Sequence, residues 1–401
     1  MKHFPRGLAV ALVLVALATP AFALAAVNPE FGYSVDLPVG WVEADGSDPE
    51  HIGFLSPNSD AMIQIIALDP GTGSDGLEIA RVMFDEVDGE GEPEAFEYQG
   101  REAALSELAF TTGGLDVQGY LVTINDRAAD YAILAFAAME SYEVAHDHLL
   151  SAIDSFSIGE KSRVYPGPVS QYFYPFPAPD ERATSVPFLD RSLPFAVDPG
   201  AEESAKVVVD RESRILEPYG ALDEEVAHDA WRRYFRMIYR DNYMRLAPVA
   251  GEVEAILEAD GLPRVDYPHE LLAWLQGFDY ERTGGLSDFQ PPVSCLANAS
   301  GDCDSLAMTY VIILHHLGFD AIMMASNVHA HALAAVDAQG GGARFPFEDK
   351  QWLVAELTAD VGLGQIDQRM ADPEGWIGVR MRLQALEGGD EDADEDADAE
   401  R

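Results

Sequence analysis

The sequence predicts a mixed α and β protein with two domains, an α/β half followed by an α+β half. Three observations support this prediction. The chain has 401 residues, which is more than one domain usually contains. Strand and helix patterns alternate in the first 158 residues, whereas a long apolar helix followed by three strands stands near the end. The expected segments are an export signal (1–25), an α/β domain (27–158), a connector that becomes helical (160–250), an α+β domain (251–386) and a disordered acidic tail (387–401).

The N-terminus carries the features of an export signal. Lys2 and Arg6 precede an apolar run at 8–18, and two overlapping small-residue patterns follow at 21–25. This order is typical of a cleaved secretory signal. An uncleaved helix stays open as an alternative, because residues 8–26 are nearly long enough to span a bilayer. We therefore predict an exported protein, either periplasmic, envelope-associated or secreted, with no membrane span after the signal.

The first domain alternates between strand and helix patterns. The expected strands are 31–37, 61–68 and 131–138, and the expected helices are 77–87 and 142–156. The segment Phe31-Gly32-Tyr33-Ser34-Val35-Asp36-Leu37-Pro38-Val39-Gly40-Trp41, with the closing helix and Ile153-Asp154-Ser155-Phe156, resembles the PsbP/Mog1-like family. The resemblance implies an α/β sandwich. Its motifs are a strand, a turn and a Trp that packs, so a binding or localisation role is expected for this domain.

The connector is rich in Pro and acidic residues and ends in a helical pattern at 223–246. Arg232, Arg236 and Arg240 recur there at four-residue spacing and therefore share one helix face. Since the chain has 70 acidic residues, the simplest interpretation is that these arginines pair with its own carboxylates. A docking face for an acidic partner or for the acidic tail is the alternative.

Cys303 stands at the predicted start of a buried helix. After the run Gly301-Asp302-Cys303-Asp304-Ser305, apolar residues recur at helical spacing up to Leu317, and Gly318 is a typical stop signal. Backbone N–H groups and the positive end of the helix dipole favour a thiolate over a thiol at such a position. Because the thiolate is the reactive form, Cys303 is the candidate nucleophile.

Three strand patterns follow this helix. They span residues 321–326, 331–337 and 352–357. The second strand begins with His331, and the third contains Glu356. A base that takes the proton of a cysteine, and an acid that orients the base, complete a catalytic triad. The predicted roles are therefore Cys303 as nucleophile, His331 as general base and then acid, and Glu356 as the orienting acid.

These motifs resemble the transglutaminase-like family of the papain-like superfamily. In that family a Gly-x-Cys helix start is followed by a His-Ala strand and then by an acid in another strand. The matching segments are Gly301-Asp302-Cys303-Asp304, His331-Ala332-Leu333-Ala334-Ala335-Val336 and Trp352-Leu353-Val354-Ala355-Glu356-Leu357-Thr358. The resemblance implies an α+β domain in which a Cys-bearing helix packs on an antiparallel sheet.

The chain departs from the family pattern at the acid. The commonest third member is Asp followed by Pro, whereas Glu356 is followed by Leu. His329 is an alternative base, because residues two apart in an extended segment point to the same side. His331 is favoured over it because it opens the apolar strand. Gln276 lies in a segment similar to the lead-in of bacterial members and is a candidate to line an oxyanion site.

Two other interpretations of these residues stay open. Cys295 and Cys303 are the only cysteines, and in an exported protein they can pair in a disulfide that would silence the nucleophile. His329, His331 and Glu356, with Cys303 as a fourth ligand, have the chemistry of a zinc site. Under the catalytic hypothesis we expect neither a metal nor a cofactor.

The charge of the chain restricts its partners. With 25 basic residues against 70 acidic ones, the formal net charge is −45. Nucleic acids and anionic membrane surfaces are repelled by such a protein. The expected partner is a protein or peptide substrate, and the oligomeric state is left open.

The sequence thus predicts an exported transglutaminase-like cysteine hydrolase that cleaves a peptide or isopeptide amide through a thioester. Hydrolysis is favoured over acyl transfer, because water is always available outside the cell and no second substrate site is evident in the sequence. The alternative is a non-catalytic envelope protein in which a degenerate papain-like domain serves as a binding scaffold, since a fold alone does not establish activity.

Overall fold

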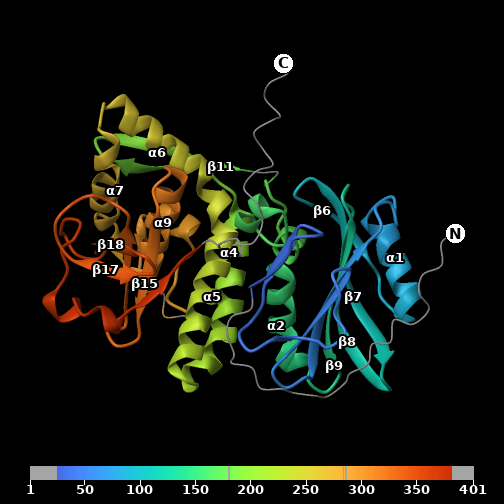
Figure 1. The fold of residues 1–401 in the computed structure, drawn as a ribbon. Coiled ribbons are helices and arrows are strands. Elements are labelled where there is room, and N and C mark those ends of the chain that lie inside the picture. Colours follow the sequence, from blue (N-terminus) through green and yellow to red (C-terminus); the bar gives the residue numbers. More distant parts are fainter. Residues whose placement is uncertain (1–24, 179–180, 283, 285–286, 382–401) are drawn as a thin grey trace.

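The computed structural model describes residues 25–178, 181–282, 284 and 287–381. It shows a mixed α+β protein with several sheets, arranged in two halves (Figure 1). The expected acidic tail and nearly all of the expected export signal lie outside the described residues. Within the described residues, no helix is both long and apolar enough to cross a membrane.

An antiparallel seven-stranded sheet forms the centre of the N-terminal half, in the order β3-β4-β5-β9-β8-β7-β6. Its strands, in chain order, are β3 (Val42–Glu43), β4 (His51–Leu55), β5 (Ala61–Leu68), β6 (Glu94–Tyr98), β7 (Arg101–Thr112), β8 (Leu115–Ile124) and β9 (Asp130–Ala138). The expected strands at 61–68 and 131–138 are confirmed. Both are buried along nearly their whole length because each of their faces is covered by a helix.

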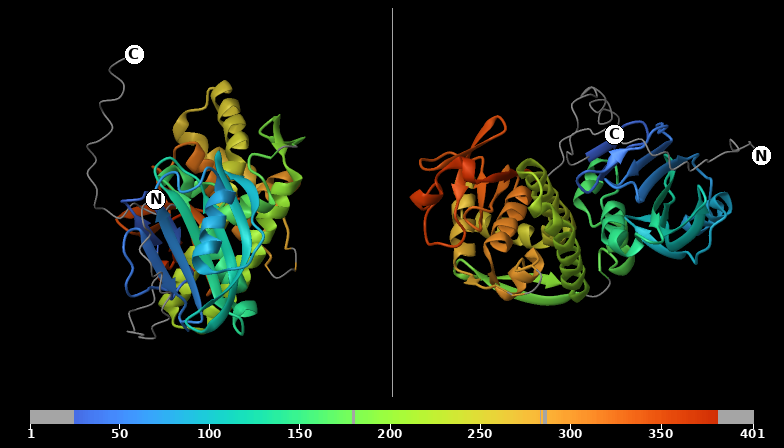
Figure 2. Two further views of the ribbon diagram at one scale, coloured as in Figure 1. Left: turned by 90° about the vertical axis from the view of Figure 1, so that its right-hand side faces the viewer. Right: turned by 90° about the horizontal axis from the view of Figure 1, so that it is seen from below.

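The two helices lie on opposite faces of this sheet (Figures 1 and 2). The outer helix α1 (Gly76–Val87) buries Ile79 and Met83 against one face, and Asp75 caps its N-terminus. The inner helix α2 (Tyr142–Asp154) buries Leu149 and Ile153 against the other face. Both helices were expected from their apolar spacing.

A small three-stranded sheet closes the N-terminal half beside α2. It has the order β1-β2-β10 and consists of β1 (Ala25–Asn28), β2 (Tyr33–Asp36) and β10 (Ser157–Ile158). The expected opening strand is therefore two residues shorter at its start and one shorter at its end. The 3-10 turn η1 (Glu160–Val164) and the short helix α3 (Pro168–Phe173) follow.

The stretch expected as a connector contains more structure than its composition suggests. It holds the hairpin β11 (Arg182–Phe188) and β12 (Arg191–Val197), and the helices α4 (Pro199–Leu216) and α5 (Glu224–Tyr243). The hairpin side chains Phe188 and Leu193 join the same apolar core as the helix that bears Cys303. The domain boundaries themselves stay predictions.

Helices α4 and α5 lie between the two halves (Figure 1), and α5 joins them through its arginines. Arg236 makes a bidentate pair with Asp36 of β2, at 2.7 and 2.9 Å. Arg233 pairs with Glu212 of α4 at 2.9 Å and also donates to the hydroxyl of Ser151 in α2. Arg232 and Arg236 thus pair with the protein's own carboxylates, as the simpler interpretation of the arginine face predicted.

The C-terminal half packs helices against a five-stranded sheet of order β17-β18-β16-β15-β19. Its strands are β15 (Ala321–Ser326), β16 (His331–Val336), β17 (Arg344–Phe347), β18 (Lys350–Ala355) and β19 (Ile377–Val379), and all neighbours are antiparallel. The helices are α6 (Ala247–Ala259), α7 (Tyr267–Gln276), α8 (Pro292–Asn298) and α9 (Cys303–His316). Nearly every residue of α9 is buried between the sheet and the other helices.

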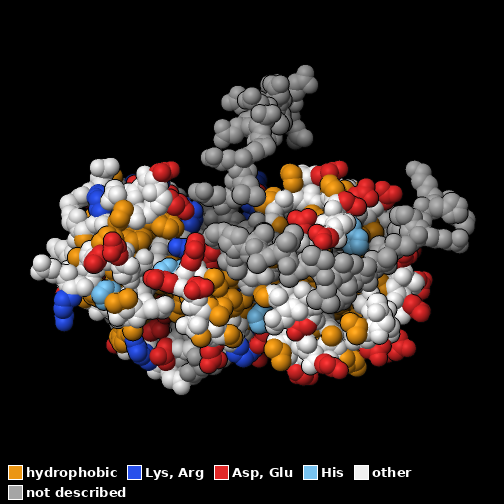
Figure 3. Space-filling view, turned by 60° about the horizontal axis from the view of Figure 1, so that its bottom comes forward, with side chains coloured by type: hydrophobic (Ala, Val, Ile, Leu, Met, Phe, Trp, Pro, Cys, Tyr) orange, Lys and Arg blue, Asp and Glu red, His pale blue; other side chains and the backbone are white. Residues whose placement is uncertain are grey.

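A parallel pair of two-residue strands, β13 (Asp279–Tyr280) and β14 (Ser300–Gly301), leads into α9. The remaining 3-10 turns are η2 (Glu217–Ala221), η3 (Met244–Leu246), η4 (Arg264–Asp266), η5 (Gln368–Met370) and η6 (Pro373–Gly375). Figure 3 shows that acidic side chains are scattered over one face of both halves, with few basic ones between them. The negative charge of the sequence is therefore carried by the folded surface as well.

Candidate active site

Cys303 is the first residue of α9, as the sequence predicted. Asp302 caps the helix by accepting a hydrogen bond from the backbone N–H of Ser305 at 2.9 Å. This cap leaves the earlier N–H groups of the first turn, including that of Cys303, without a partner inside the helix. The thiol is buried, with 4% of the residue exposed, yet it lines a cavity.

The backbone before Cys303 has room only for a small residue. A Cβ atom on Gly301 would lie 3.0 Å from the Cβ of Ser305 and 3.1 Å from the sulfur of Cys295. Gly301 also pairs with Tyr280 in the short parallel ladder. The glycine therefore lets the chain pass close to α8 and α9 just before the nucleophile, which holds the start of the helix in place.

His331 opens β16 and lies between Cys303 and Glu356. Its Nε2 atom is 2.9 Å from the Oε2 atom of Glu356. A side-chain hydrogen bond also joins the imidazole to Cys303. The structure thus brings together the nucleophile, the base and the orienting acid that were predicted from three separate segments; their catalytic roles stay predictions.

The charge of His331 follows from these contacts. Burial of the ring lowers its pKa, but the hydrogen bonds to Cys303 and Glu356 outweigh that effect and raise the pKa to about 10. His331 is therefore protonated near neutral pH. His331 therefore places a positive charge beside the sulfur of Cys303.

Glu356 is held as an anion behind the imidazole. Burial acts to raise its pKa, but hydrogen bonds from His331 and Thr358 bring the pKa below its usual value. The backbone N–H and the hydroxyl of Thr358 donate to Oε1 at 2.8 and 2.7 Å, which leaves Oε2 for the histidine. An acid fixed in this way keeps the imidazole in one orientation.

The structure places Gln276 behind Glu356. Its side-chain nitrogen donates to the backbone carbonyls of Glu356 and Val361, both at 2.8 Å. It does not line the cavity at Cys303, where an oxyanion would form. In this position Gln276 supports the segment that carries the orienting acid.

His329 lies in the turn before β16, outside the strand. Ala330 has a positive φ of 47°, so the segment is not extended at this point. Both rings nevertheless line the hollow on the side of Glu356, and the ring of His331 also lies near Trp376, at 6.3 Å. The ring of His329 packs at 5.4 Å from that of Trp376, and its backbone N–H donates to Ser326.

The cavity beside Cys303 has a volume of about 310 Å³. Several lining residues were not singled out by the sequence as parts of a site, among them Trp231 from α5, the exposed Arg282, and Asp288. Trp231 belongs to the helical pattern that was expected to be a connector. Its place in the chain therefore gave no sign that it reaches the nucleophile.

Two carboxylates make this cavity sensitive to pH. Burial and the neighbouring Asp302 raise the pKa of Asp304 to about 7, although His331 acts to lower it. Burial also raises the pKa of Asp302, against its hydrogen bonds from Ser305. Asp304 therefore gains its negative charge in the neutral range, next to the nucleophile.

The two alternatives for these cysteines and histidines can be compared with the structure. Cys295 and Cys303 are both free and buried, so no disulfide joins them. Burial raises the pKa of Cys295 to about 12, which makes it an unreactive thiol near neutral pH. Among the described residues, no group of three or more His, Cys, Asp or Glu side chains is arranged to hold a metal ion.

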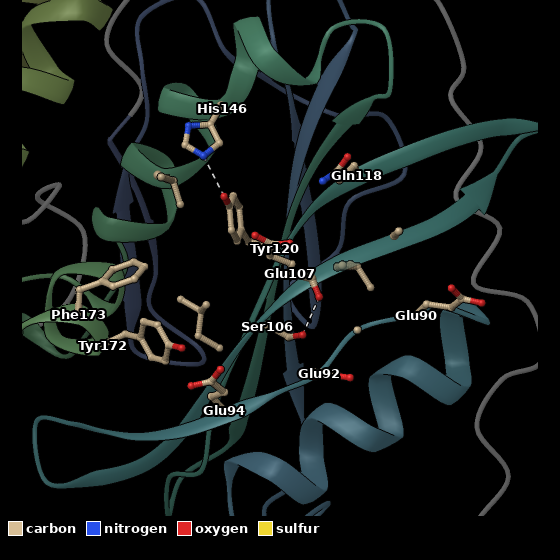
Figure 4. Close-up of a pocket in the computed structure, with 15 residues that line it drawn as sticks. Glu90, Glu92, Glu94, Ser106, Glu107, Gln118, Tyr120, His146, Tyr172 and Phe173 are labelled. Carbon is tan, nitrogen blue, oxygen red and sulfur yellow. Dashed lines mark hydrogen bonds between the residues drawn. The ribbon is translucent and has the colours of Figure 1, made fainter.

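A larger hollow of about 670 Å³ lies in the N-terminal half, lined by residues of β7, β8, α2 and α3 (Figure 4). Figure 4 shows His146 and Tyr120 pointing toward each other, and the distance from Nε2 to the hydroxyl is 2.9 Å. Ser106 donates to the backbone carbonyl of Glu107. The histidine thus faces a tyrosine, and the serine faces the main chain, so the lining holds no nucleophile beside a base.

No protein-family model matches the sequence, and no curated protein matches it. Several solved structures are similar in part. Cyanobacterial PsbP (CyanoP) from Synechocystis sp. PCC 6803 is 16% identical with a TM-score of 0.29, and the match covers 36% of this chain and 98% of that one. A protein from Bacteroides thetaiotaomicron VPI-5482 is 12% identical with a TM-score of 0.26, covering 79% and 87%.

LpqN, described as involved in cell envelope biogenesis of Mycobacterium tuberculosis, is 13% identical with a TM-score of 0.22, covering 32% of this chain and 83% of that one. The neighbours thus include a PsbP protein, the family that the first domain resembles in sequence. TM-scores this low carry no further argument, so the functional proposal rests on the residues of this chain.

Proposed function

We propose that this protein is an exported cysteine hydrolase of transglutaminase-like type that acts on a peptide or isopeptide amide. The observation that supports it is the contact of His331 with both Cys303 and Glu356, at the start of a helix and beside a cavity. A buried thiol alone would be an ordinary core residue. A thiol with a protonated imidazole and an oriented carboxylate has what acyl transfer requires.

The proposed reaction has two steps. The sulfur of Cys303 attacks the amide carbonyl carbon, the C–S bond forms, and the C–N bond breaks while His331 gives its proton to the leaving amine. His331 then takes a proton from water, the hydroxide attacks the thioester carbonyl, and the acid is released. The proton that His331 took from water restores the imidazolium, and the sulfur leaves as thiolate.

The surroundings of His331 suit an extended substrate. Ala330 and His331 line the cavity at Cys303 and also a hollow of about 690 Å³ on the side of Glu356 and Thr358. A chain that crosses the imidazole can therefore occupy both spaces at once. Main-chain amides in extended peptides fit such a groove better than a compact small molecule does.

The experiment that tests the proposal is acyl-enzyme trapping. The purified protein is mixed with a p-nitrophenyl ester, quenched in acid and digested, and the peptides are analysed by mass spectrometry. An acyl group on Cys303 is expected, together with steady release of p-nitrophenol as water turns the thioester over.

Two variants serve as controls. Cys295→Ala should keep the adduct on Cys303, because Cys295 is buried away from the cavity. Glu356→Gln should slow both acylation and turnover, since an amide orients the imidazole without holding its charge. An adduct spread over lysines and both cysteines, or no adduct at all, would leave the chain as a binding scaffold.

A further inference from the structure

A cavity at the junction of the two halves differs from the rest of the molecule in charge. It has a volume of about 520 Å³ and is lined from β2, η1, α5 and the residues that end the described chain. Its charged lining consists of four cations and two carboxylates: Lys161, Arg163, Arg236, Arg240, Asp36 and Glu160. In a chain with 25 basic and 70 acidic residues, this excess of positive charge is a local exception.

Arg240 is a buried cation that lacks a carboxylate partner among the described residues. The residue is 6% exposed, and its guanidinium donates to the backbone carbonyls of Tyr165 and Phe156. The other two arginines that are buried as deeply, Arg211 and Arg233, each pair with a carboxylate. Since buried charges are normally paired, an anion from outside the protein can balance the charge of Arg240.

Arg163 supplies an unsatisfied donor in the same cavity. Its Nε atom donates to the hydroxyl of Ser34 at 3.0 Å, but its Nη1 atom is buried and has no hydrogen-bond partner. Lys161 is exposed at the rim and has no ion pair with a described residue. Because Arg236 pairs with Asp36, Glu160 is the one remaining carboxylate of the lining that can balance Lys161, Arg163 and Arg240.

Most of the uncharged lining is apolar and adaptable, although Ser155 and Ser157 also belong to it. It includes Val164, Tyr165, Met237, Met244 and Met381. Methionine side chains adjust their shape to a guest because they are unbranched and flexible. A cavity of this size with an apolar wall and a few convergent polar groups is typical of a small-molecule site.

We propose that this cavity binds an organic acid, with its carboxylate near Arg163 and Arg240 and its apolar chain against the methionines. The inference does not depend on the activity proposed for Cys303, which lies in a different cavity. Guanidinium groups suit a carboxylate because they offer two parallel N–H donors. A neutral or cationic guest with the same chain is a poor substitute, because it leaves the two arginines unpaired.

The test is isothermal titration calorimetry of the full chain with octanoate. Octanoate is expected to bind with one site per chain. Octylamine, which keeps the chain but loses the carboxylate, should bind at least about tenfold more weakly, the scale of one charged hydrogen bond. Acetate, which keeps the carboxylate but loses the buried chain, should also bind at least about tenfold more weakly. Absence of saturable octanoate binding, or equal binding of octylamine or acetate, would overturn the proposal.

Variants then locate the site. Arg163→Gln should weaken octanoate binding by about tenfold, and Lys161→Glu at the exposed rim should weaken it without risk to folding. Arg81→Gln, on the distant helix α1, is the matched control and should bind like the parent. Equal affinity in all three variants would overturn the proposal. So would binding that occurs only in a chain ending at Met381, because the cavity would then belong to residues 382–401.

Discussion

The seven-stranded sheet of the N-terminal half and the five-stranded sheet of the C-terminal half both bury apolar side chains under helices. They differ in where their reactive side chains stand. In the first half, His146 lies in the middle of α2 and meets the hydroxyl of Tyr120. In the second half, Cys303 and His331 each begin an element, and Glu356 directly follows one.

This difference explains why the hollow of the N-terminal half is not the candidate active site. Side chains in the middle of an element are surrounded by neighbours that satisfy them, as Tyr120 satisfies His146. The ends of elements leave backbone N–H groups and side chains open to a cavity. Whether a hollow can serve as an active site therefore depends on which ends of helices and strands the fold brings together there, and less on its volume.

The sharpest test of this comparison is the nucleophile itself. Cys303→Ala should abolish turnover of an amide or ester substrate, because the carbon–sulfur bond of the thioester cannot form. In the parent, iodoacetamide should label Cys303 faster than Cys295, whose pKa is raised to about 12. Rates are followed by mass spectrometry of the two cysteine peptides near neutral pH. Equal labelling of both thiols would show that the cysteine at the start of a helix is no more reactive than the cysteine in the core.

The second test compares the two histidines beside the site. His331→Ala should lower kcat by roughly a hundredfold or more, the scale of a lost general base. His329→Ala should change kcat much less, because its ring packs on Trp376 and does not touch the sulfur. Steady-state kinetics of both variants decide between them. The reverse order would show that His329 is the base.

The third test concerns the junction of the two halves. Arg236→Ala should destabilise the protein by about 3 kcal/mol, because it leaves the buried carboxylate of Asp36 without its partner. Arg232→Ala on the same helix removes a more exposed pair and should cost at most about 1 kcal/mol. Urea unfolding measures both changes. Similar losses would mean that burial of the pair contributes nothing to joining the halves.

The smallest expected effect is a pH-dependent change at Asp304. Because its pKa in the folded state is raised to about 7, this carboxyl stabilises the fold below its unfolded pKa, and that contribution is lost as pH rises through about 7. Asp304→Asn should therefore raise the melting temperature at pH 8, by roughly 2–6 °C, and change it little at pH 4. Melting curves of parent and variant at both values provide the check. A gain that is the same at both pH values would contradict the charge argument.

Much of the fold could be predicted from the pattern of apolar residues. The strand at 321–326 and the start of α9 at Cys303 agree with their sequence signals, because strand runs and helix caps are local properties. The hairpin β11–β12 was not foreseen in the connector, since the prolines within both strands hid the pattern. The turn at Ala330 was not foreseen, because its backbone conformation cannot be inferred from the residues around it.

The sequence by itself determined the order Cys303, His331 and Glu356, and the capped helix that places the thiol at a positive helix end. These depend on neighbours within a few residues, so they can be inferred from spacing alone. Only the tertiary structure decided that Gln276 holds the segment of Glu356, and that Trp231 of α5 reaches the cavity. The same holds for the cationic cavity of Arg163 and Arg240, whose lining comes from segments far apart in the chain. Such contacts arise from the packing of distant elements, which residue spacing along one chain does not encode.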